Sequence, residues 1–252
     1  LRPLLLISTA DAINGSGDKF LTSASAIEMI HTYSLIHDDL PAMDNDDYRR
    51  GKLTNHKVFG EAMAILAGDA LLTLAFEVIL RQRGVSNETL LFVVNEMSKA
   101  AGASGMVGGQ ALDLISEGKK IDLATLKKMH LGKTGALFKA AVRSGAKLAG
   151  ATDEQLKALT SYAESFGLAF QITDDILDVT STLEELGKPV LSDQKNDKTT
   201  YVTLYGIDKA TAIVNEISDE ALKLYDELES SKAVFKNAFL RDLLVMLVNR
   251  KK

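Results

Sequence analysis

The sequence of 252 residues contains no cysteine and only three prolines. Without cysteine the chain can form no disulfide framework and carry out no thiolate chemistry. The prolines stand far apart, at positions 3, 41 and 189, so they leave room for long uninterrupted helices. Whatever chemistry the chain performs must come from other side chains.

Excess positive charge and long apolar runs are also missing. The net charge of −5 argues against a nucleic-acid partner, for which a basic patch is expected. No apolar run reaches the roughly 20 residues that a membrane span needs, and the run from Leu4 to Ile7 is too short for the core of a signal peptide. We therefore expect a cytoplasmic protein with no stable membrane insertion and no bound nucleic acid.

Helical periodicity runs through almost the whole chain, whereas period-two alternation and strand-turn-strand signals are missing. The expected helices cover residues 21–40, 58–82, 87–103, 122–149 (interrupted at 132–135), 153–179, 208–229 and 232–250, with polar segments at 11–19 and 180–200. Ser86 or Asn87 is suited to cap the third helix. No linker divides the chain, so the prediction is one all-α domain over residues 1–252, with earlier residues of the natural chain missing before Leu1.

Five carboxylates fall within ten residues between Asp38 and Asp47, directly after an apolar, helix-like segment, and Arg49 and Arg50 follow at once. The apolar lead-in indicates that the carboxylates stand at the end of a buried helix, where their repulsion needs cations. Hard oxygen ligands favour Mg²⁺, which commonly keeps waters and takes a substrate phosphate as a further ligand. Guanidinium groups match phosphate oxygens. The segment therefore predicts a site for a metal ion and a diphosphate.

A second acidic cluster lies far along the chain, within residues 170–178. Its polar members, spaced by three, four and seven positions, are Gln171, Asp174, Asp175 and Asp178. Residues with this spacing share one face of a helix. The residues between them are apolar, so the helix is mostly buried. Two such clusters could hold a polyphosphate between them through several Mg²⁺ ions.

Taken in chain order, these motifs resemble the short-chain trans-prenyltransferases, and most closely the bacterial farnesyl diphosphate synthases. Nearly the whole chain follows the order of the family's motifs. They are Leu1-Arg2-Pro3, His31, Asp38-Asp39-x-x-x-x-Asp44, Arg49-Arg50-Gly51, Gly109-Gln110-x-x-Asp113, Lys133-Thr134-Gly135, Phe170-Gln171, Asp174-Asp175-x-x-Asp178, Gly187-Lys188-Pro189 and Asp197-Lys198. The first acidic motif alone has modest specificity, but both motifs with these companions are very specific.

The resemblance implies an all-α, single-domain bundle of the isoprenoid synthase type with a central cavity, assembled as a homodimer. It also implies the condensation of isopentenyl diphosphate with dimethylallyl and then geranyl diphosphate to give farnesyl diphosphate. The allylic C–O bond ionises, the double bond of isopentenyl diphosphate attacks the cation, and a proton is lost to the released diphosphate. About three Mg²⁺ ions per active site neutralise the leaving group.

The resemblance further implies roles for individual residues. The metal ligands would be Asp38, Asp39, Asp44, Asp174 and Asp178. The allylic diphosphate would be held by Arg49, Lys133 and Lys198, and isopentenyl diphosphate by Arg2, His31 and Arg50. Thr134 and Gln171 would face the reacting carbons, and Lys188 would sit on a loop that closes over the diphosphate. The lysine that the family carries just before the position of Arg2 is absent from this chain.

Tyr33 bears on the length of the product. It lies five positions before Asp38, about 7.5 Å deeper along the helix at ~1.5 Å per residue. An aromatic ring at this depth would form the floor of the pocket in which the growing chain lies. In the family this bulk resembles the pattern for a farnesyl-length product, whereas small residues allow longer chains.

Other functions remain open at this point. A geranylgeranyl diphosphate synthase of the same family is disfavoured only by Tyr33. A terpene cyclase shares the metal chemistry and the fold but needs no isopentenyl site, so Arg2, His31 and Arg50 count against it. A non-catalytic synthase subunit usually loses the acidic motifs, which are intact here. His130 carries no signal that the sequence can interpret.

Overall fold

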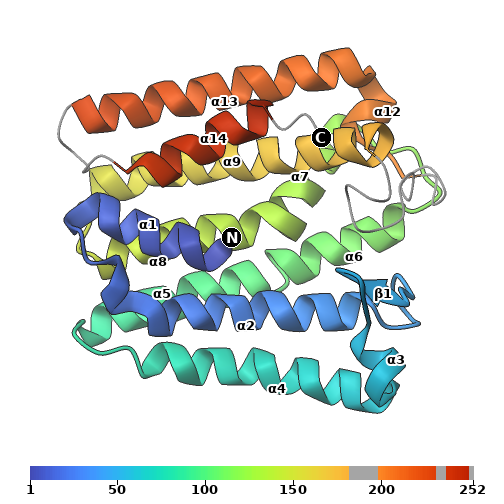
Figure 1. The fold of residues 1–252 in the computed structure, drawn as a ribbon, viewed down its shortest axis with the longest axis horizontal. Coiled ribbons are helices and arrows are strands. Elements are labelled where there is room, and N and C mark those ends of the chain that lie inside the picture. Colours follow the sequence, from blue (N-terminus) through green and yellow to red (C-terminus); the bar gives the residue numbers. More distant parts are fainter. Residues whose placement is uncertain (182–197, 231–236, 250–252) are drawn as a thin grey trace.

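The computed structural model describes residues 1–181, 198–230 and 237–249 (Figure 1). The helices in these ranges are α1 (Arg2–Asn14), α2 (Leu21–Asp38), α3 (Asn55–Phe59), α4 (Glu61–Leu80), α5 (Asn87–Ala101), α6 (Met106–Ser116), α7 (Leu123–His130), α8 (Ala136–Leu148), α9 (Asp153–Thr180), α12 (Tyr201–Tyr205), α13 (Ile207–Ser230) and α14 (Ala238–Asn249). Shorter elements are the 3₁₀-helix η1 (Gly17–Phe20), the π-helix η2 (Leu131–Gly135) and the strands β1 (Tyr48–Arg49) and β2 (Lys52–Leu53). The predicted all-α fold class is confirmed.

The long helices lie roughly side by side, in layers that run from α4 at one edge of the molecule to α13 at the other (Figure 1). Helix α2 packs against α4, α1 and α5 pack against α8, and α9 packs against both α8 and α13. Each helix thereby buries an apolar face against the next layer. The two helices that carry the acidic clusters, α2 and α9, belong to different layers, with α8 and η2 between them.

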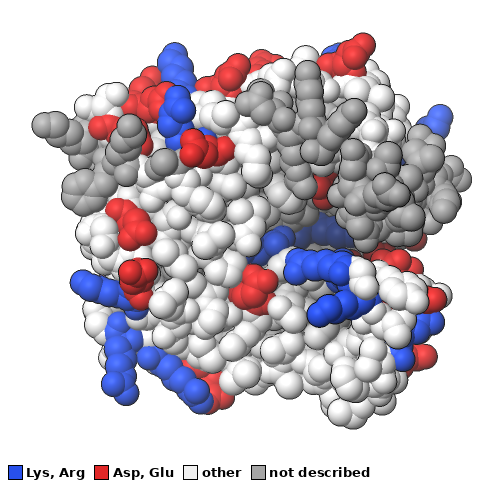
Figure 2. Space-filling model, in the orientation of Figure 1, with Lys and Arg blue, Asp and Glu red and all other residues white. Residues whose placement is uncertain are grey.

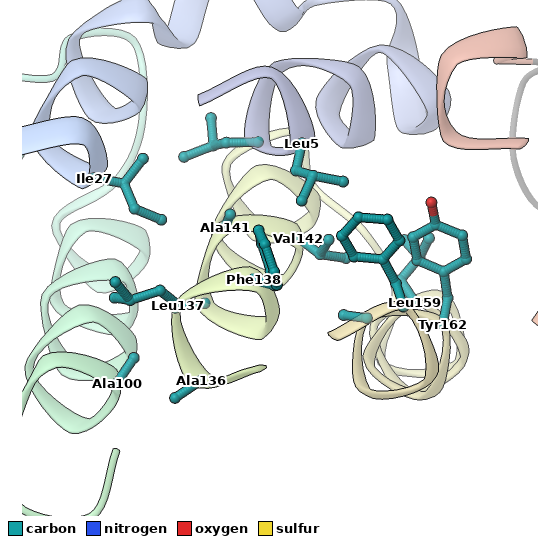
Figure 3. Packing of buried hydrophobic residues seen from close by; sticks show 14 of the residues in the cluster. Leu5, Ile27, Ala100, Ala136, Leu137, Phe138, Ala141, Val142, Leu159 and Tyr162 are labelled. Atoms are coloured by element: carbon teal, nitrogen blue, oxygen red, sulfur yellow. The ribbon is translucent and has the colours of Figure 1, made fainter. Parts of the chain in front are cut away.

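The hydrophobic core is centred on α8 (Figure 3). The ring of Phe138 meets the ring of Phe166 on α9 edge to face, with centroids 5.1 Å apart, an arrangement that aromatic pairs favour. Side chains from α1, α2, α8 and α9 that are fully buried around it are Leu5, Ile27, Leu137, Val142 and Leu159. This packing fixes the relative positions of the helices that carry the polar residues.

Four of the predicted helices, at 21–40, 87–103, 153–179 and 208–229, match α2, α5, α9 and α13 to within two residues at each end. The Ser86 hydroxyl accepts a hydrogen bond from the Thr89 N–H at 3.1 Å and caps α5 as predicted. Of the helix predicted over 232–250, the described part is α14. The segment predicted over 180–200 lies largely outside the described residues.

Three sequence-based assignments are wrong. The helix predicted over 58–82 is divided at Gly60, whose φ of 84° ends α3 and begins α4, because this backbone conformation cannot continue a helix. The polar segment 11–19 is partly helical, since α1 continues to Asn14. The strands β1 and β2 were not predicted, because two residues per strand are too few to show alternation.

Helix α4 leaves a broad apolar surface uncovered. Together with α3 and α5 it exposes Phe59 (65%), Leu66 (59%) and Leu91 (67%). By length and composition α4 could cross a membrane, although 28% of the relevant window is buried. A search for uninterrupted apolar runs does not find this helix, because Asp69 and Glu77 interrupt the run while the mean hydropathy of an 18-residue window of the helix stays high at 2.0.

Candidate active site

The first acidic cluster ends α2 and is held by the β1–β2 hairpin. Asp38 is the last residue of α2 and Asp39 is its C-cap, so both carboxylates stand at the negative end of the helix dipole, where they are unfavourable. The hairpin turn is made by Arg50 and Gly51 at φ values of 52° and 73°, as a tight hairpin requires. The hairpin presents Arg49, whose guanidinium donates to Asp39 at 2.6 and 2.7 Å.

Asp38 lines the interior cavity. The side-chain amide of Gln110 on α6 donates to it at 2.7 Å. Burial, together with Asp44 and Asp39, raises the pKa of Asp38 to about 6, although Lys133 opposes the shift. A buried carboxylate among other carboxylates is stabilised by any added positive charge. The end of α2 is therefore a favourable place for a cation.

The second acidic cluster occupies the last two turns of α9. Asp175 is buried and accepts a hydrogen bond from the backbone N–H of Tyr201 at 3.0 Å. Nε2 of His130 lies 4.0 Å from the same carboxylate. Asp178 is buried and Asp174 is half-buried. Asp175 is thus engaged by the start of α12, which agrees with its omission from the predicted metal ligands.

The π-helix η2 joins the two acidic walls. Lys133 lies close enough to Asp38 to lower its pKa against the effect of burial. The next residue, Thr134, donates its hydroxyl to Gln171 of α9 at 2.8 Å. Both acidic clusters therefore border the same five-residue segment, as a ligand shared between them requires.

Glycines allow α6 and α9 to approach η2 closely. A Cβ on Gly109 of α6 would clash with the backbone nitrogen of Lys133, and a Cβ on Gly167 of α9 would lie 3.0 Å from the Cα of Gly135. π-Helices are rare and occur frequently at functional sites. The tight packing around η2 therefore indicates that the backbone of Lys133 is held in a defined position.

Asp113 on α6 holds two lysines at once. Its Oδ2 lies 2.6 Å from Nζ of Lys133 and 3.3 Å from Nζ of Lys198. Burial alone would raise the pKa of Asp113, but the two lysines lower it. Burial alone would lower the pKa of Lys198, but Asp113, Asp44 and Glu117 raise it. The raised pKa keeps Lys198 charged, and the Asp113 carboxylate fixes both lysines in position for an anion.

A second group of cations surrounds His31. Burial, followed by the charges of Arg2 and Arg50, lowers the pKa of His31 to about 3. The guanidinium of Arg2 lies 4.6 Å from the Phe138 ring centroid, and its buried Nε has no hydrogen-bond partner among the described residues. Figure 2 shows Lys and Arg side chains around a hollow on this face. A buried guanidinium with an unused donor is suited to an anionic ligand.

A cavity of about 570 Å³ connects these groups. Its polar lining includes Arg2, His31, Asp38, Gln110, Lys133 and Thr134, and its apolar lining includes Leu35, Met43, Ile65, Met106, Val107 and Leu114. Such a volume accommodates an organic ligand of moderate size. The lining of the cavity therefore combines charged groups with an apolar surface.

Tyr33 lies where α2 enters the core and lines the same cavity. It is only 5% exposed, and its ring meets His37 edge to face with centroids 5.7 Å apart. Its hydroxyl has no hydrogen-bond partner among the described residues. The position agrees with a pocket floor, and its effect on product length stays a prediction.

The donor groups suit Mg²⁺. Within the described part of the chain, no three His, Cys, Asp or Glu side chains are already arranged around one metal position. The predicted ligands on the two walls are nevertheless carboxylates at or just beyond helix C-termini, where the helix dipole adds negative potential. Because Mg²⁺ keeps waters and takes phosphate oxygens from a substrate, it needs few protein ligands.

The structure places six of the predicted site residues in the lining of the cavity, namely Arg2, His31, Tyr33, Asp38, Lys133 and Thr134. Gln171 reaches η2 through its hydrogen bond with Thr134. Other predicted residues that the structure describes do not line the cavity, namely Asp39, Asp44, Arg49, Arg50, Asp174, Asp178 and Lys198. The residue roles themselves remain predictions, and Lys188 lies outside the described residues. Sequence reasoning did not include Gln110 and Asp113 among the site residues, although the motif that contains them was recognised. Their spacing of three places both on one face of α6, but the partners, Asp38 and the two lysines, are visible only in the fold.

Comparisons with known proteins agree with this arrangement. The family model described as polyprenyl synthetase matches residues 1–239. Over 252 residues the chain is 48% identical to the farnesyl diphosphate synthase of Micrococcus luteus, covering all of this chain and 84% of that protein. It is 49% identical over 228 residues to the geranylgeranyl diphosphate synthase of Cyanophora paradoxa, covering 88% and 76%.

Some relatives are longer than this chain. The dimethylallyltranstransferase of Fischerella ambigua (strain UTEX 1903) is 52% identical over 225 residues, but the match spans only 65% of its length. Among solved structures, a geranyltransferase from Helicobacter pylori, complexed with magnesium and isoprenyl diphosphate, aligns with a TM-score of 0.85 at 34% identity. That alignment covers 98% of this chain and 82% of the other.

Proposed function

The chain belongs to the polyprenyl synthetase family, and on that premise we propose that it condenses isopentenyl diphosphate with an allylic diphosphate in a Mg²⁺-dependent reaction. The observation that carries the proposal is the single cavity into which Asp38, Lys133, Arg2 and His31 all project. It combines a carboxylate, cations for phosphate and an apolar surface. These are the groups that two diphosphate esters and their hydrocarbon chains require.

The allylic diphosphate binds between the two acidic walls. Mg²⁺ would be held by Asp38, Asp39 and Asp44 on one wall and by Asp174 and Asp178 on the other, and it would supply positive charge that neutralises the departing diphosphate. Arg49, Lys133 and Lys198 bind the diphosphate oxygens directly. Because Asp113 fixes two of these cations before the substrate arrives, little reorganisation is needed as the C–O bond breaks.

The cation left on the allylic fragment lies near Thr134 and Gln171, whose mutual hydrogen bond of 2.8 Å orients their oxygen dipoles. Isopentenyl diphosphate is held by Arg2, His31 and Arg50. Its double bond attacks the allylic carbon, a new C–C bond forms, and a proton is lost to the released diphosphate. The neutral His31 contributes a hydrogen bond rather than a charge, because burial and the neighbouring arginines lower its pKa to about 3.

We propose farnesyl diphosphate as the main product, because the buried ring of Tyr33 limits the depth of the cavity. Relatives named for farnesyl and for geranylgeranyl products are about equally similar to this chain, so the family alone leaves the product length open. Geranylgeranyl diphosphate is therefore the second candidate.

Chain-length analysis of the products tests the proposal. Labelled isopentenyl diphosphate is incubated with Mg²⁺ and either dimethylallyl or geranyl diphosphate. We expect farnesyl diphosphate with both acceptors. Mainly geranylgeranyl diphosphate would contradict the assigned length, and no elongation with either acceptor would contradict the activity. Consumption of farnesyl diphosphate supplied alone would instead indicate a terpene cyclase.

The exposed apolar surface of α3, α4 and α5 supports a homodimer. Its members include Phe59, Leu66 and Leu91, all more than half exposed, and extended apolar surfaces on soluble chains mark contact sites. Ile65 of α4 is 45% exposed and also lines the cavity. A second copy on this surface would therefore help to close the cavity.

Light scattering after gel filtration tests this assembly. We expect a dimer for the wild type and for Leu204→Arg, which changes an exposed leucine elsewhere, and a monomer for Leu66→Arg. A monomeric wild type, or a wild type that floats with lipid vesicles because α4 inserts into them, would contradict the dimer.

A further inference from the structure

A second cavity of about 750 Å³ lies away from the acidic walls, between α5, α7, α8 and α9. Five cationic residues line it: Lys99, Lys127, Lys128, Lys139 and Arg143. Glu96 is the acidic residue in the same lining. Since the whole chain carries a net charge of −5, this cavity, here called the outer groove, concentrates positive charge in an otherwise acidic protein.

Two of these cations already have partners. Arg143 donates to both carboxylate oxygens of Glu96, at 2.7 and 3.2 Å, and Lys139 pairs with Glu164 at 3.1 Å. The remaining three, Lys99, Lys127 and Lys128, have no ion pair with any described carboxylate. The paired cations form a fixed wall, and the three unpaired lysines are available to a ligand.

Stabilisation by helix dipoles explains part of the clustering of lysines in the groove. Lys127 and Lys128 lie in the last turn of α7, where cations are stabilised by the dipole. Lys99 lies in the last turn of another helix, α5, where the same dipole effect applies, and it faces the same space. The apolar lining of the groove is made of Ala100, Ala124, Leu131, Ala136 and Ala140, of which Ala100, Ala136 and Ala140 belong to the hydrophobic core. Cationic rim and apolar floor together suit a ligand with an anionic head and a hydrocarbon body.

The outer groove and the active-site cavity share η2 as a wall. Leu131 and Gly132 line the groove, whereas the next two residues, Lys133 and Thr134, line the active-site cavity. A Cβ on Gly132 would lie 3.2 Å from the carbonyl oxygen of Gly105 on the α6 side. Leu131 and Lys133 therefore belong to one short, tightly packed element, so a ligand on Leu131 touches the element that carries Lys133.

We propose that the outer groove binds an amphiphilic phosphate ester, a phosphate or diphosphate head on an apolar chain, and that its binding changes catalysis by moving Lys133 through η2. The kinetic consequence rests on the proposed prenyltransferase activity, whereas the binding itself does not. The groove is thus a regulatory site separate from the two substrate positions.

The test compares the wild type with a groove variant, Lys99→Gln/Lys127→Gln/Lys128→Gln. The matched control is Lys19→Gln/Lys209→Gln/Lys223→Gln, which removes three exposed lysines that do not line the groove. Farnesyl diphosphate is added while geranyl and isopentenyl diphosphates are saturating, so that binding at the active site is outcompeted. We expect kcat to change by about fivefold or more in the wild type and the control, and to stay constant in the groove variant.

Direct binding separates this proposal from the proposed activity. If the chain elongates no acceptor, calorimetry with farnesyl diphosphate still tests the groove, and we expect its affinity for a site outside the acidic walls to fall at least about tenfold in the groove variant. Equal binding by wild type and groove variant would overturn the site. Inorganic diphosphate that binds the groove as tightly as farnesyl diphosphate would overturn the role of the apolar floor.

Discussion

The two acidic walls of the cavity carry similar aspartate motifs but are built in different ways. The α2 wall ends at its aspartates, and side chains from other elements hold them: the guanidinium of Arg49 pairs with Asp39, and the neutral amide of Gln110 donates a hydrogen bond to Asp38. The α9 wall lies within a helix of 28 residues. There a backbone N–H, that of Tyr201, binds Asp175.

The difference shows that an aspartate cluster can be held in place in two ways: by side chains from other elements, as on α2, or by a backbone N–H against a buried helix, as on α9. On the α2 wall the protein holds two aspartates that are also assigned to the metal, Asp38 and Asp39, whereas on the α9 wall it holds Asp175, which is not assigned to the metal. The α2 wall depends on a hairpin that is itself exposed, whereas the α9 wall depends on burial and on the docking of α12. Substitutions on each wall test whether the two walls contribute equally to catalysis although they are built differently.

The largest effect is expected from the aspartates assigned to the metal. Asp38→Asn and Asp174→Asn should each lower kcat by about 10³-fold or more, because each removes negative charge from the site that holds Mg²⁺. Steady-state rates with geranyl and labelled isopentenyl diphosphates measure this. Asp47→Asn, which changes an exposed aspartate paired with Lys57, is the control and should stay near wild type. A large loss from one wall alone would show that the walls are not equivalent.

A smaller loss is expected from Asp113, which stands between the walls as a positioning residue. Asp113→Asn should lower kcat/KM for the allylic substrate by about 10²-fold, because Lys133 and Lys198 lose the carboxylate that fixes them. Asp113→Glu should recover part of the activity. The control is Asp122→Asn, since asparagine also caps a helix well. Equal activity of Asp113→Asn and Asp113→Glu would argue against the positioning role.

The α9 wall should show a pH effect on stability. Burial lowers the pKa of His130 to about 4, so between pH 6.5 and 4 the unfolded chain binds a proton that the folded chain does not. The free energy of unfolding should therefore fall by about 1.5 kcal/mol from this residue between pH 6.5 and 5. Urea unfolding of wild type and His130→Gln at both pH values measures it. A difference between the two proteins that is the same at both pH values would contradict the assignment.

A substitution of Tyr33, at the deep end of the α2 wall, should have the smallest effect on the rate but should change the product. Tyr33→Ala should lengthen the product by one isoprene unit while kcat changes by less than about threefold, because the reacting atoms lie near Asp38 rather than at the floor. Chromatography of the dephosphorylated products measures this. Tyr33→Phe keeps the ring and should keep the product. An unchanged product from Tyr33→Ala would remove Tyr33 as the floor.

Much of this architecture could be predicted because its signals are local. The helix boundaries of α2, α5, α9 and α13 follow from periodicity and caps, which depend on neighbours within a few residues. The division of 58–82 at Gly60 was missed because glycine is tolerated inside many helices, and only its φ of 84° shows the break. Spacing on a helix face grouped Asp174 with Asp178, whereas the assignment of Asp38 and Asp174 as metal ligands came from the resemblance and stays a prediction.

The amino-acid sequence by itself determined the all-α class, the helices α2, α5, α9 and α13, and the two aspartate clusters with their neighbouring cations, because periodicity and residue type are properties of short segments. Only the tertiary structure decided that Asp113 grips two lysines that are 65 residues apart in the chain, that η2 joins both acidic walls, and that the outer groove shares η2 with the cavity. These relations depend on how α6, α8 and α9 pack, and packing is set by contacts between residues far apart in sequence.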